Sequence, residues 1–309
     1  MKSQLPALRP YRLCAVITAF FPQSYRDLSV LLDGFRVCRD LGFDAVEFFY
    51  EGDYRSEIDQ ELKILGLESI FAPSLYAKMY ALQLAALDVA ERKQAVKTMC
   101  GYLDMGMRYG AKQAMLVSGT EGDASDIPAA LSRLQESIGE ICTHAYRKNA
   151  EFFITMETFN NTGEPYYLLG PTGRSVDFAE SVRLEHKNFG LTIDLSHLTQ
   201  LKEPQAKAIE SARSVCNHIH IANCVVSKGN HPLFGDKHPP LDYPEGDVDT
   251  DTILMFVKQF LKDSAYHPTT VSTIGLEVIA RAPATFQETA ASTKAYFDRL
   301  IKRFEGGVL

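Results

Sequence analysis

The 309-residue chain contains no tryptophan, no long apolar run and no excess of basic residues. The missing tryptophan excludes no class of protein, but the other two absences do. No stretch approaches the ~18–20 uninterrupted apolar residues of a membrane-spanning helix, so we expect no membrane partner. The formal net charge of −7 argues against a nucleic-acid partner, which usually requires a basic stripe. The N-terminal sequence MKSQLPALRP has no apolar core, so we expect no signal peptide.

Paired cysteine motifs are also missing. The six cysteines are scattered without a C-x-x-C pair, and most of them lie inside apolar patterns. Such thiols behave as small buried hydrophobic groups, and this usage is typical of a reducing compartment. We therefore expect a cytoplasmic protein with free cysteines, which are Cys14, Cys38, Cys100, Cys142, Cys216 and Cys224.

The composition that remains is that of a folded domain. Hydrophobic residues make up 46% of the chain and charged residues 23%, which excludes a disordered or fibrous protein. A length of 309 residues suits two average domains, but an α/β barrel forms one domain of ~250 residues or more. No linker or shift in composition marks a domain boundary.

Eight short apolar runs alternate with amphipathic segments of helical spacing. Eight strand–helix pairs predict an α/β fold, a single-domain (β/α)8 TIM barrel over residues 1–309. A doubly wound sheet is the alternative, but no glycine-rich phosphate loop follows the first run. The expected strands are Leu13–Phe20, Ala45–Phe49, Glu68–Phe71, Gln113–Val117, Phe152–Glu157, Gly190–Asp194, His218–Ala222 and Ile274–Ile279.

One segment lacks both helical and strand periodicity. It runs from Cys224 to Asp249, directly after the seventh expected strand, and it is rich in glycine, proline and histidine. Irregular loops longer than ~12–15 residues are usually functional or disordered, so this loop is a candidate part of the site.

Four neighbouring strands carry residues that bind metals or move protons. Glu157 ends the fifth strand, Asp194 ends the sixth, His220 lies in the seventh and Glu277 in the eighth. In TIM barrels the active site forms at the C-terminal ends of the strands. The sequence therefore predicts that these four side chains meet at one end of the barrel.

The alternation of side chains along a strand predicts which way they point. Leu276 and Val278 share the outer face of the eighth strand, so Glu277 points into the barrel. The same argument turns His218 and His220 inward, and the carboxylates of the fifth and sixth strands share their faces with threonines. Carboxylates gathered there repel one another, and the loss of hydration costs each of them several kcal/mol. A bound divalent cation offsets both costs.

Each of these residues also has an ordinary explanation. A glutamate at a strand end is commonly solvated, and Asp194 could simply cap a helix. We expect His218 to be a histidine of the barrel interior whose hydrogen bonds are satisfied, and we leave it out of the metal set. The coincidence of four strand ends favours a metal site. An oxygen-rich ligand set suits Mn²⁺, Mg²⁺ or Co²⁺, with Zn²⁺ as a further candidate. The predicted ligands are Glu157, Asp194, His220 and Glu277.

A second group of candidates surrounds this set. Asp236 and His238, in the long loop, could share a face with His197 and hold a second metal or hydrogen-bond a polyol. A histidine-rich loop without special role is the alternative. Glu47 ends the second strand as an inward carboxylate that could contact a substrate hydroxyl. Arg281 follows the eighth strand and is either a surface residue or a substrate contact.

These motifs resemble the xylose isomerase-like superfamily of TIM barrels. The resemblance covers nearly the whole chain and is strongest from Met156 through the Asp194-Leu-Ser-His197 and His220-Ile-Ala-Asn-Cys224 phrases to Val278. The phrase Phe234-Gly-Asp-Lys-His238-Pro is most similar to a branch of sugar phosphate isomerases and epimerases.

The resemblance implies a role for each ligand. Glu157, Asp194, His220 and Glu277 match the four metal ligands of the ketose epimerases, in which the two glutamates also act as acid and base. The implied substrate is a small polyhydroxylated molecule, processed through a metal-stabilised enediolate. Members of the superfamily are commonly oligomers, so a homo-oligomer is allowed.

Two departures from the family pattern bear on the substrate. Ketose epimerases place an arginine in the loop after the seventh strand, whereas this loop offers only Lys228 and Lys237. The combination of His197, Asp236 and His238 resembles the ligands of a further zinc in the nuclease branch. That branch also has histidines at earlier strand ends, where this chain has other residues.

The sequence leaves several functions open. We expect a metal-dependent sugar isomerase or epimerase of carbohydrate metabolism. A lyase that dehydrates a keto-polyol would share the same proton abstraction. An endonuclease for abasic DNA fits the net charge of −7 poorly. A sugar-binding scaffold on a decayed barrel fits the intact ligand set poorly.

Overall fold

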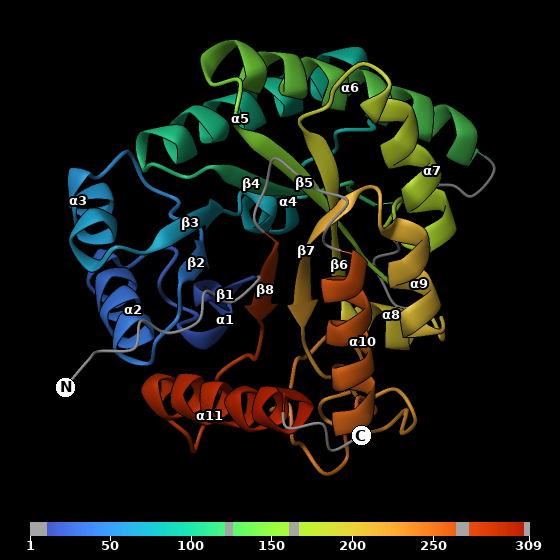
Figure 1. Cartoon of the computed structure of the whole chain (residues 1–309). Helices are drawn as coiled ribbons and strands as arrows, with labels where there is room; N and C mark the ends of the chain where they lie inside the picture. Colours follow the sequence, from blue (N-terminus) through green and yellow to red (C-terminus); the bar gives the residue numbers. More distant parts are fainter. Residues whose placement is uncertain (1–10, 121–125, 161–166, 264–271, 306–309) are drawn as a thin grey trace.

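The computed structural model describes residues 11–120, 126–160, 167–263 and 272–305. Eight parallel strands pair in sequence order and close into a barrel because β1 also pairs with β8. Figure 1 shows helices arranged around this barrel, with α10 and α11 completing the ring. The predicted (β/α)8 fold is confirmed. The strands are β1 (Arg12–Val16), β2 (Ala45–Phe48), β3 (Glu68–Phe71), β4 (Gln113–Val117), β5 (Phe153–Thr158), β6 (Phe189–Asp194), β7 (Cys216–Ile221) and β8 (Thr273–Leu276).

Each strand is followed by at least one helix. Long amphipathic helices pack one face on the strands, as the helical spacing of their apolar residues predicts. The helices are α1 (Ile17–Phe20), α2 (Leu28–Asp40), α3 (Ser56–Leu65), α4 (Ser74–Met79), α5 (Val89–Arg108), α6 (Ile127–Lys148), α7 (Thr172–Arg183), α8 (Leu195–Gln200), α9 (Gln205–Ala212), α10 (Thr250–Asp263) and α11 (Phe286–Glu305). Among the described residues, none of these helices has the length and apolarity needed to cross a bilayer.

The main hydrophobic core lies between the strands and the helices. Ile219 and Ile221 of β7 and Leu276 of β8 are fully buried in this layer, which confirms the predicted outer faces of these two strands. Burying each of these side chains contributes roughly 1.5–3 kcal/mol to folding. The packing therefore fixes the rotation of each strand and, with it, the direction of the side chains that point inward.

Two predicted strands are shorter in the structure. The run from Ile17 to Phe20 forms helix α1 rather than the end of β1, because a short buried apolar run has no periodicity that separates strand from helix. Strand β8 ends at Leu276, so Glu277 lies one residue beyond it. The backbone N–H of Glu277 still donates to the carbonyl oxygen of Ile221 at 3.1 Å, which keeps this residue beside β7.

Polar side chains fill part of the barrel interior. Gln113 Nε2 donates to Thr155 Oγ1 (3.2 Å), Thr192 Oγ1 donates to the same hydroxyl (2.9 Å), and Asn217 Nδ2 donates to Gln113 Oε1 (3.1 Å). Buried polar groups cost free energy unless they are hydrogen-bonded, and these bonds meet that requirement. Thr155 and Thr192 lie two residues before Glu157 and Asp194 on the same strands. These polar side chains therefore fill the barrel interior directly beneath its mouth, next to the candidate site.

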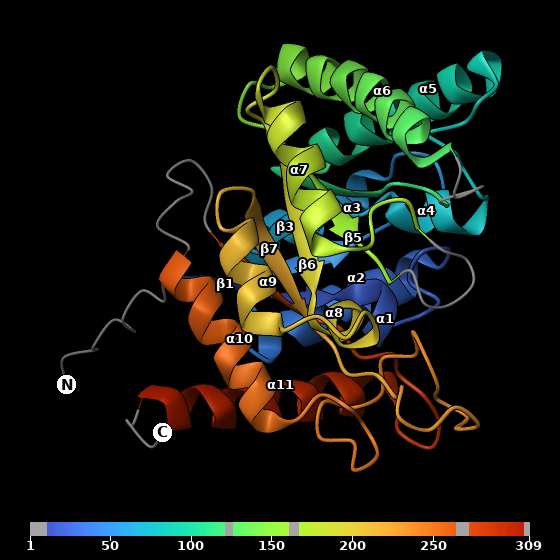
Figure 2. The ribbon, with the colours of Figure 1, turned by 90° about the vertical axis from the view of Figure 1, so that its right-hand side faces the viewer.

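The connection from β7 to α10 contains no helix and no strand of the sheet, as the sequence predicts. In Figure 2 this orange loop lies on the right, on the same side of the barrel as α1 and α4. These segments follow the C-terminal ends of β7, β1 and β3, so they surround the mouth of the barrel. The N-terminal decapeptide predicted to carry no signal peptide lies outside the described residues.

Candidate metal centre and active site

Four ligand-type side chains meet at the mouth of the barrel. Glu157 lies near the end of β5, Asp194 is the last residue of β6, His220 lies in β7 and Glu277 directly follows β8. One side-chain oxygen or nitrogen from each residue lies within 4.8 Å of the others. The structure therefore brings together the four residues that the sequence predicts as metal ligands.

His220 is the centre of this group. Its Nδ1 atom lies 3.1 Å from Oε1 of Glu157 and 2.9 Å from Oε2 of Glu277. The imidazole is 1% exposed, so both contacts form in a poorly hydrated environment. Three atoms of ligand character thus converge from β5, from β7 and from the residue that follows β8.

Asp194 uses its two carboxylate oxygens differently. Oδ1 caps helix α8 by accepting from the backbone N–H of His197 at 3.0 Å and from the hydroxyl of Ser196. Oδ2 is buried and has no hydrogen-bond partner within the described part of the chain. A buried carboxylate oxygen without a partner is costly, so Oδ2 fits a ligand that binds at this point.

The charges in this group shift the pKa values of its members. Burial raises the pKa of Glu157 above its ordinary value. Burial also acts on Glu277, but the positive charges of His238 and His220 outweigh it and lower the pKa of Glu277 to about 2. The pKa of His220 is raised well above its ordinary value, because Glu47 and Glu277 outweigh the effect of burial. Such opposed environments are typical of catalytic carboxylate pairs.

A second group of residues lies beside the first. Asp236 and His238, in the loop after β7, approach His197 on α8 closely enough to form a further three-residue set. Asp236 Oδ1 lies 2.8 Å from Nε2 of His238. Burial would raise the pKa of Asp236, but the charges of His238 and His197 lower it well below its ordinary value. The structure thus brings together the three residues predicted to hold a second metal or a polyol.

Glu277 connects the two groups. Its Oε2 faces His220, while its Oε1 lies 3.8 Å from Nε2 of His238. The carboxylates of Asp236 and Glu277 outweigh burial and raise the pKa of His238 to about 10. The carboxylate of Glu277 therefore contacts a histidine of each group, so a molecule that binds to this carboxylate affects both groups.

The backbone at His238 adopts an unusual conformation. His238 has a φ of +39°, in the left-handed region that non-glycine residues rarely adopt. Its carbonyl oxygen accepts from the backbone N–H of Ile279 at 3.0 Å and from Arg281 Nη1 at 3.4 Å. Arg281 also donates to the carbonyls of Ile279 (2.9 Å) and Lys237. The predicted substrate contact of Arg281 stays a prediction, while its observed contacts fix the loop that carries His238.

Glu47 lies beside His220, on the side away from the carboxylates. The side chain of Glu47 is 2% exposed, and its Oε2 lies 3.1 Å from Nε2 of His218 and 3.2 Å from Nε2 of His220. The two imidazoles outweigh burial and lower the pKa of Glu47 to about 2. The substrate contact predicted for Glu47 stays a prediction, and the contacts that the structure shows are with His218 and His220.

The sequence reasoning missed Lys78, which lies on the short helix α4. The Lys78 side chain is exposed, and its Nζ lies 4.5 Å from the ring centroid of Phe159, the residue that follows β5. The ring of Phe159 in turn lies 4.3 Å from that of His197. Partial loss of hydration at the mouth would lower the pKa of Lys78, but the charges of Asp236 and Glu157 raise it. The one sequence signal for Lys78 is its position in the segment after β3, at the C-terminal end of the barrel.

Two other cations in loops near the mouth have partners in the protein. Arg26 Nε lies 2.9 Å from Glu51 Oε2, and Lys228 Nζ lies 2.6 Å from Glu245 Oε2. Among the described residues, Lys78 has no ion pair within 4.0 Å.

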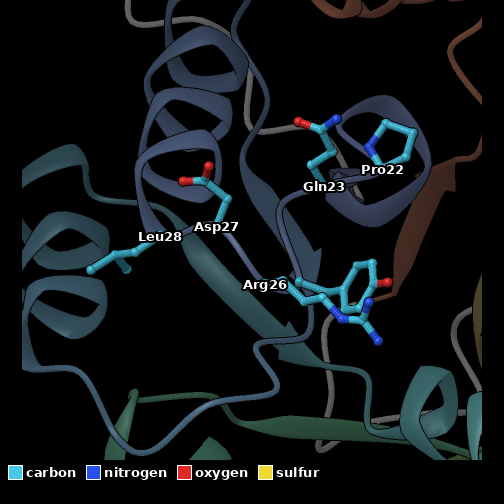
Figure 3. A pocket seen from close by; sticks show the side chains of 6 residues that line it. Pro22, Gln23, Arg26, Asp27 and Leu28 are labelled. Carbon is cyan, nitrogen blue, oxygen red and sulfur yellow. The ribbon is translucent and has the colours of Figure 1, made fainter.

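A surface hollow of about 470 Å³ lies on the loop between α1 and α2 (Figure 3). Its lining includes Arg26 and Asp27, and Asp27 caps α2 by accepting from the backbone N–H of Ser29 at 2.9 Å. None of the predicted site residues lines this hollow. The candidate chemistry lies at the barrel mouth instead.

The first group fits a divalent cation. It offers three carboxylates and one imidazole, a donor set that suits Mn²⁺, Mg²⁺, Co²⁺ or Zn²⁺. The unpartnered Oδ2 of Asp194 and the mutual approach of Glu157 and Glu277 to one nitrogen are both explained by a positive charge at this point.

Comparison with known proteins agrees with this fold. A family model described as the xylose isomerase-like TIM barrel matches residues 35–298. No curated protein gives a significant match to the sequence. Solved structures with a similar fold include a D-tagatose 3-epimerase-like protein (TM-score 0.74, 14% identity, covering 96% of this chain and 100% of that chain). An L-ribulose 3-epimerase has a TM-score of 0.71 at 14% identity, covering 96% and 97%. The IOLI protein with a bound zinc atom has a TM-score of 0.72 at 14% identity, covering 95% and 99%.

Gly275 provides the space that His220 occupies, so Gly275→Ala tests the assignment of His220. A Cβ atom at Gly275 would lie 2.7 Å from Cδ2 of His220, so the ring must move. We expect the affinity for Mn²⁺, measured by calorimetry, to fall by roughly 10–100-fold. Gly173→Ala on α7 is the control, because nothing lies within 4 Å of its added Cβ. Unchanged affinity in Gly275→Ala would contradict the role of His220 as a ligand.

Proposed function

Because the chain belongs to the xylose isomerase-like TIM barrel family, we propose that it is a divalent-metal-dependent isomerase or epimerase of sugars or sugar phosphates. The observation that carries this proposal is the convergence of Glu157, Asp194, His220 and Glu277 at the barrel mouth. The printed names of structurally similar proteins, which include sugar 3-epimerases, support the same substrate class. The zinc atom named for a further similar structure supports a metal.

The four converging residues would hold one divalent cation. When bound, the cation would withdraw electron density from a substrate carbonyl and lower the pKa of the adjacent carbon acid. The three carboxylates and the imidazole suit Mn²⁺, Mg²⁺, Co²⁺ or Zn²⁺. The cation would also offset the repulsion between carboxylates that the barrel brings together.

Glu157 and Glu277 would move the proton. They approach the same nitrogen, Nδ1 of His220, from β5 and from the end of β8, so both would face a substrate bound to the cation. One glutamate removes the proton next to the carbonyl, giving an enediolate, and the other returns a proton. Return to the opposite face of the same carbon gives epimerisation, whereas return to the neighbouring carbon gives isomerisation between aldose and ketose.

His197, Asp236 and His238 would bind substrate hydroxyls. The side-chain amides of Gln200 (3.3 Å) and Asn160 (3.5 Å) face Nδ1 of His197, so this nitrogen accepts and Nε2 carries the proton. A protonated Nε2 donates to an oxygen but does not bind a cation, which favours a hydroxyl over a second metal at these residues. Two cations per chain in a metal analysis would instead assign the second site to a metal.

Lys78 would bind the far end of the substrate. It supplies the positive charge that the ketose epimerases obtain from an arginine in the loop after the seventh strand. In this loop Lys228 is paired with Glu245, which leaves Lys78 better placed to contact the substrate. We also propose a cytoplasmic protein of carbohydrate metabolism with a small polyhydroxylated substrate, without nucleic-acid or membrane partners and with a homo-oligomer allowed.

The proposed function is tested by screening a panel of ketoses, aldoses and their phosphates with Mn²⁺ in D₂O. We expect turnover of at least one member with deuterium incorporated next to the carbonyl, and loss of turnover when EDTA removes the metal. Restoration by added Mn²⁺ controls for damage by the chelator. No exchange on any member would contradict the proposal, and a product that has lost one water would identify a keto-polyol dehydratase instead.

Substituting Glu277 separates catalysis from folding. We expect Glu277→Gln to lower kcat by about 10²–10⁴-fold, because the amide cannot take or return a proton. The thermal melting temperature should stay close to that of the wild type, since the amide keeps the shape of the carboxylate. Glu140→Gln, on the exposed face of α6, is the matched control. Global unfolding of Glu277→Gln would mean that Glu277 is structural.

Substituting Lys78 tests the proposed substrate contact. We expect Lys78→Ala to raise KM for the accepted sugar by about tenfold, with a smaller change in kcat, because a charge-assisted hydrogen bond is lost. Lys78→Arg should restore most of the affinity, and Lys93→Ala on the exposed face of α5 should have no effect. An unchanged KM in Lys78→Ala would remove Lys78 from the substrate site.

A further inference from the structure

We propose that Glu47 is a positioning residue, which holds a proton on Nε2 of His220 and so directs the free electron pair of Nδ1 toward the cation. This inference rests on the cation of the proposed function. It concerns a residue that lies outside the metal-ligand set and 173 residues from His220 in the sequence. The argument follows from the atoms around each imidazole nitrogen.

The geometry divides the two nitrogens of His220. Nδ1 lies within 3.1 Å of the carboxylates of Glu157 and Glu277 and is the nitrogen that faces the cluster. Nε2 points the other way, 3.2 Å from Oε2 of Glu47. Without a cation, Nδ1 faces two carboxylates and also carries a proton, which a bound cation displaces. A proton held on Nε2 then leaves the electron pair of Nδ1 free to bind the cation.

His218 completes the arrangement. Its Nε2 lies 3.1 Å from the same Oε2 atom of Glu47 and 3.0 Å from Nε2 of His220. A carboxylate oxygen only accepts, so both nitrogens that approach it must donate. The alternative is a hydrogen bond from one Nε2 to the other, and it would leave an unshared electron pair of the accepting imidazole beside the carboxylate. That imidazole is His218 at 3.1 Å in one direction and His220 at 3.2 Å in the other.

The other nitrogen of His218 is consistent with this assignment. His218 Nδ1 contacts the hydroxyl of Thr273, which can donate to it. His218 is then neutral, with one accepting and one donating nitrogen, and its predicted role as a satisfied barrel histidine stays a prediction. Hydrogen bonds thus connect Thr273, His218, Glu47 and His220 in a row. In this assignment each donor of the row faces an acceptor.

An amide replaces the carboxylate of Glu47 only in part. Both imidazoles approach the same atom, Oε2, so in Glu47→Gln the amide oxygen can accept from both of them. The amide oxygen carries no charge, and it therefore holds the proton on Nε2 of His220 less strongly than the carboxylate does. A proton that moves from Nε2 to Nδ1 occupies the position where the cation binds.

The experiment measures cation binding without substrate. We expect the affinity of the full-length protein for Mn²⁺, measured by calorimetry after removal of metals, to fall by about 10–100-fold in Glu47→Gln. Glu47→Asp keeps the charge and should recover part of the affinity. Thr192→Val is the control, since it removes a buried hydroxyl of the barrel interior that donates to Thr155 and, among the described residues, has no hydrogen bond to either imidazole.

A second measurement identifies the proton itself. In the Zn²⁺-loaded wild type, nitrogen NMR of labelled histidines should show a protonated Nε2 on His220, and this signal should be lost or shifted in Glu47→Gln. Unchanged affinity together with an unchanged signal would overturn the proposal. So would unchanged affinity with a raised KM, which would make Glu47 the substrate contact that the sequence predicts.

A change in stoichiometry would also overturn it. If Glu47→Gln lost one whole cation per chain at unchanged affinity for the rest, Glu47, His218 and His220 would themselves be a metal site. Because the calorimetry and the NMR measurement use no sugar, a failure to find turnover on any sugar would count against the proposed function and leave the role of Glu47 decided separately.

Discussion

The structure depends on the approach of two glutamates to a single imidazole nitrogen in a poorly hydrated barrel mouth. Glu157 and Glu277 reach Nδ1 of His220 from two strands that are separated by more than one hundred residues of sequence. Carboxylates this close repel one another, and burial deprives them of water. The closed hydrogen-bonded barrel is what keeps them together, because neither strand can turn away without exposing its apolar outer face.

The need to hold these side chains together at the mouth explains two further features of the structure. Gly275 lacks a side chain where the ring of His220 needs space. The loop after β7 returns to the mouth and is held there through Arg281 and the carbonyl oxygen of His238. The left-handed backbone of His238 costs of order 1–3 kcal/mol, and the contacts around it make that conformation the one the loop adopts.

Much of this arrangement could be predicted from the sequence. Strand alternation was sufficient to turn Glu277 and His220 inward, because the apolar residues beside them can only face the helices. Other features could not be predicted in this way. Helix α1 arises from an apolar run that carries no periodicity, and Lys78 lies on a short helix without a motif. The contacts of Glu47 with two imidazoles join positions 171 and 173 residues apart, which depends on barrel closure rather than on any local pattern.

Asp194 gives the two groups at the mouth a common mechanical support. One of its oxygens caps helix α8, and the other faces the candidate cation. The capped helix carries His197, so Asp194 belongs to the first group through one oxygen and holds the first turn of a helix that carries a residue of the second group through the other.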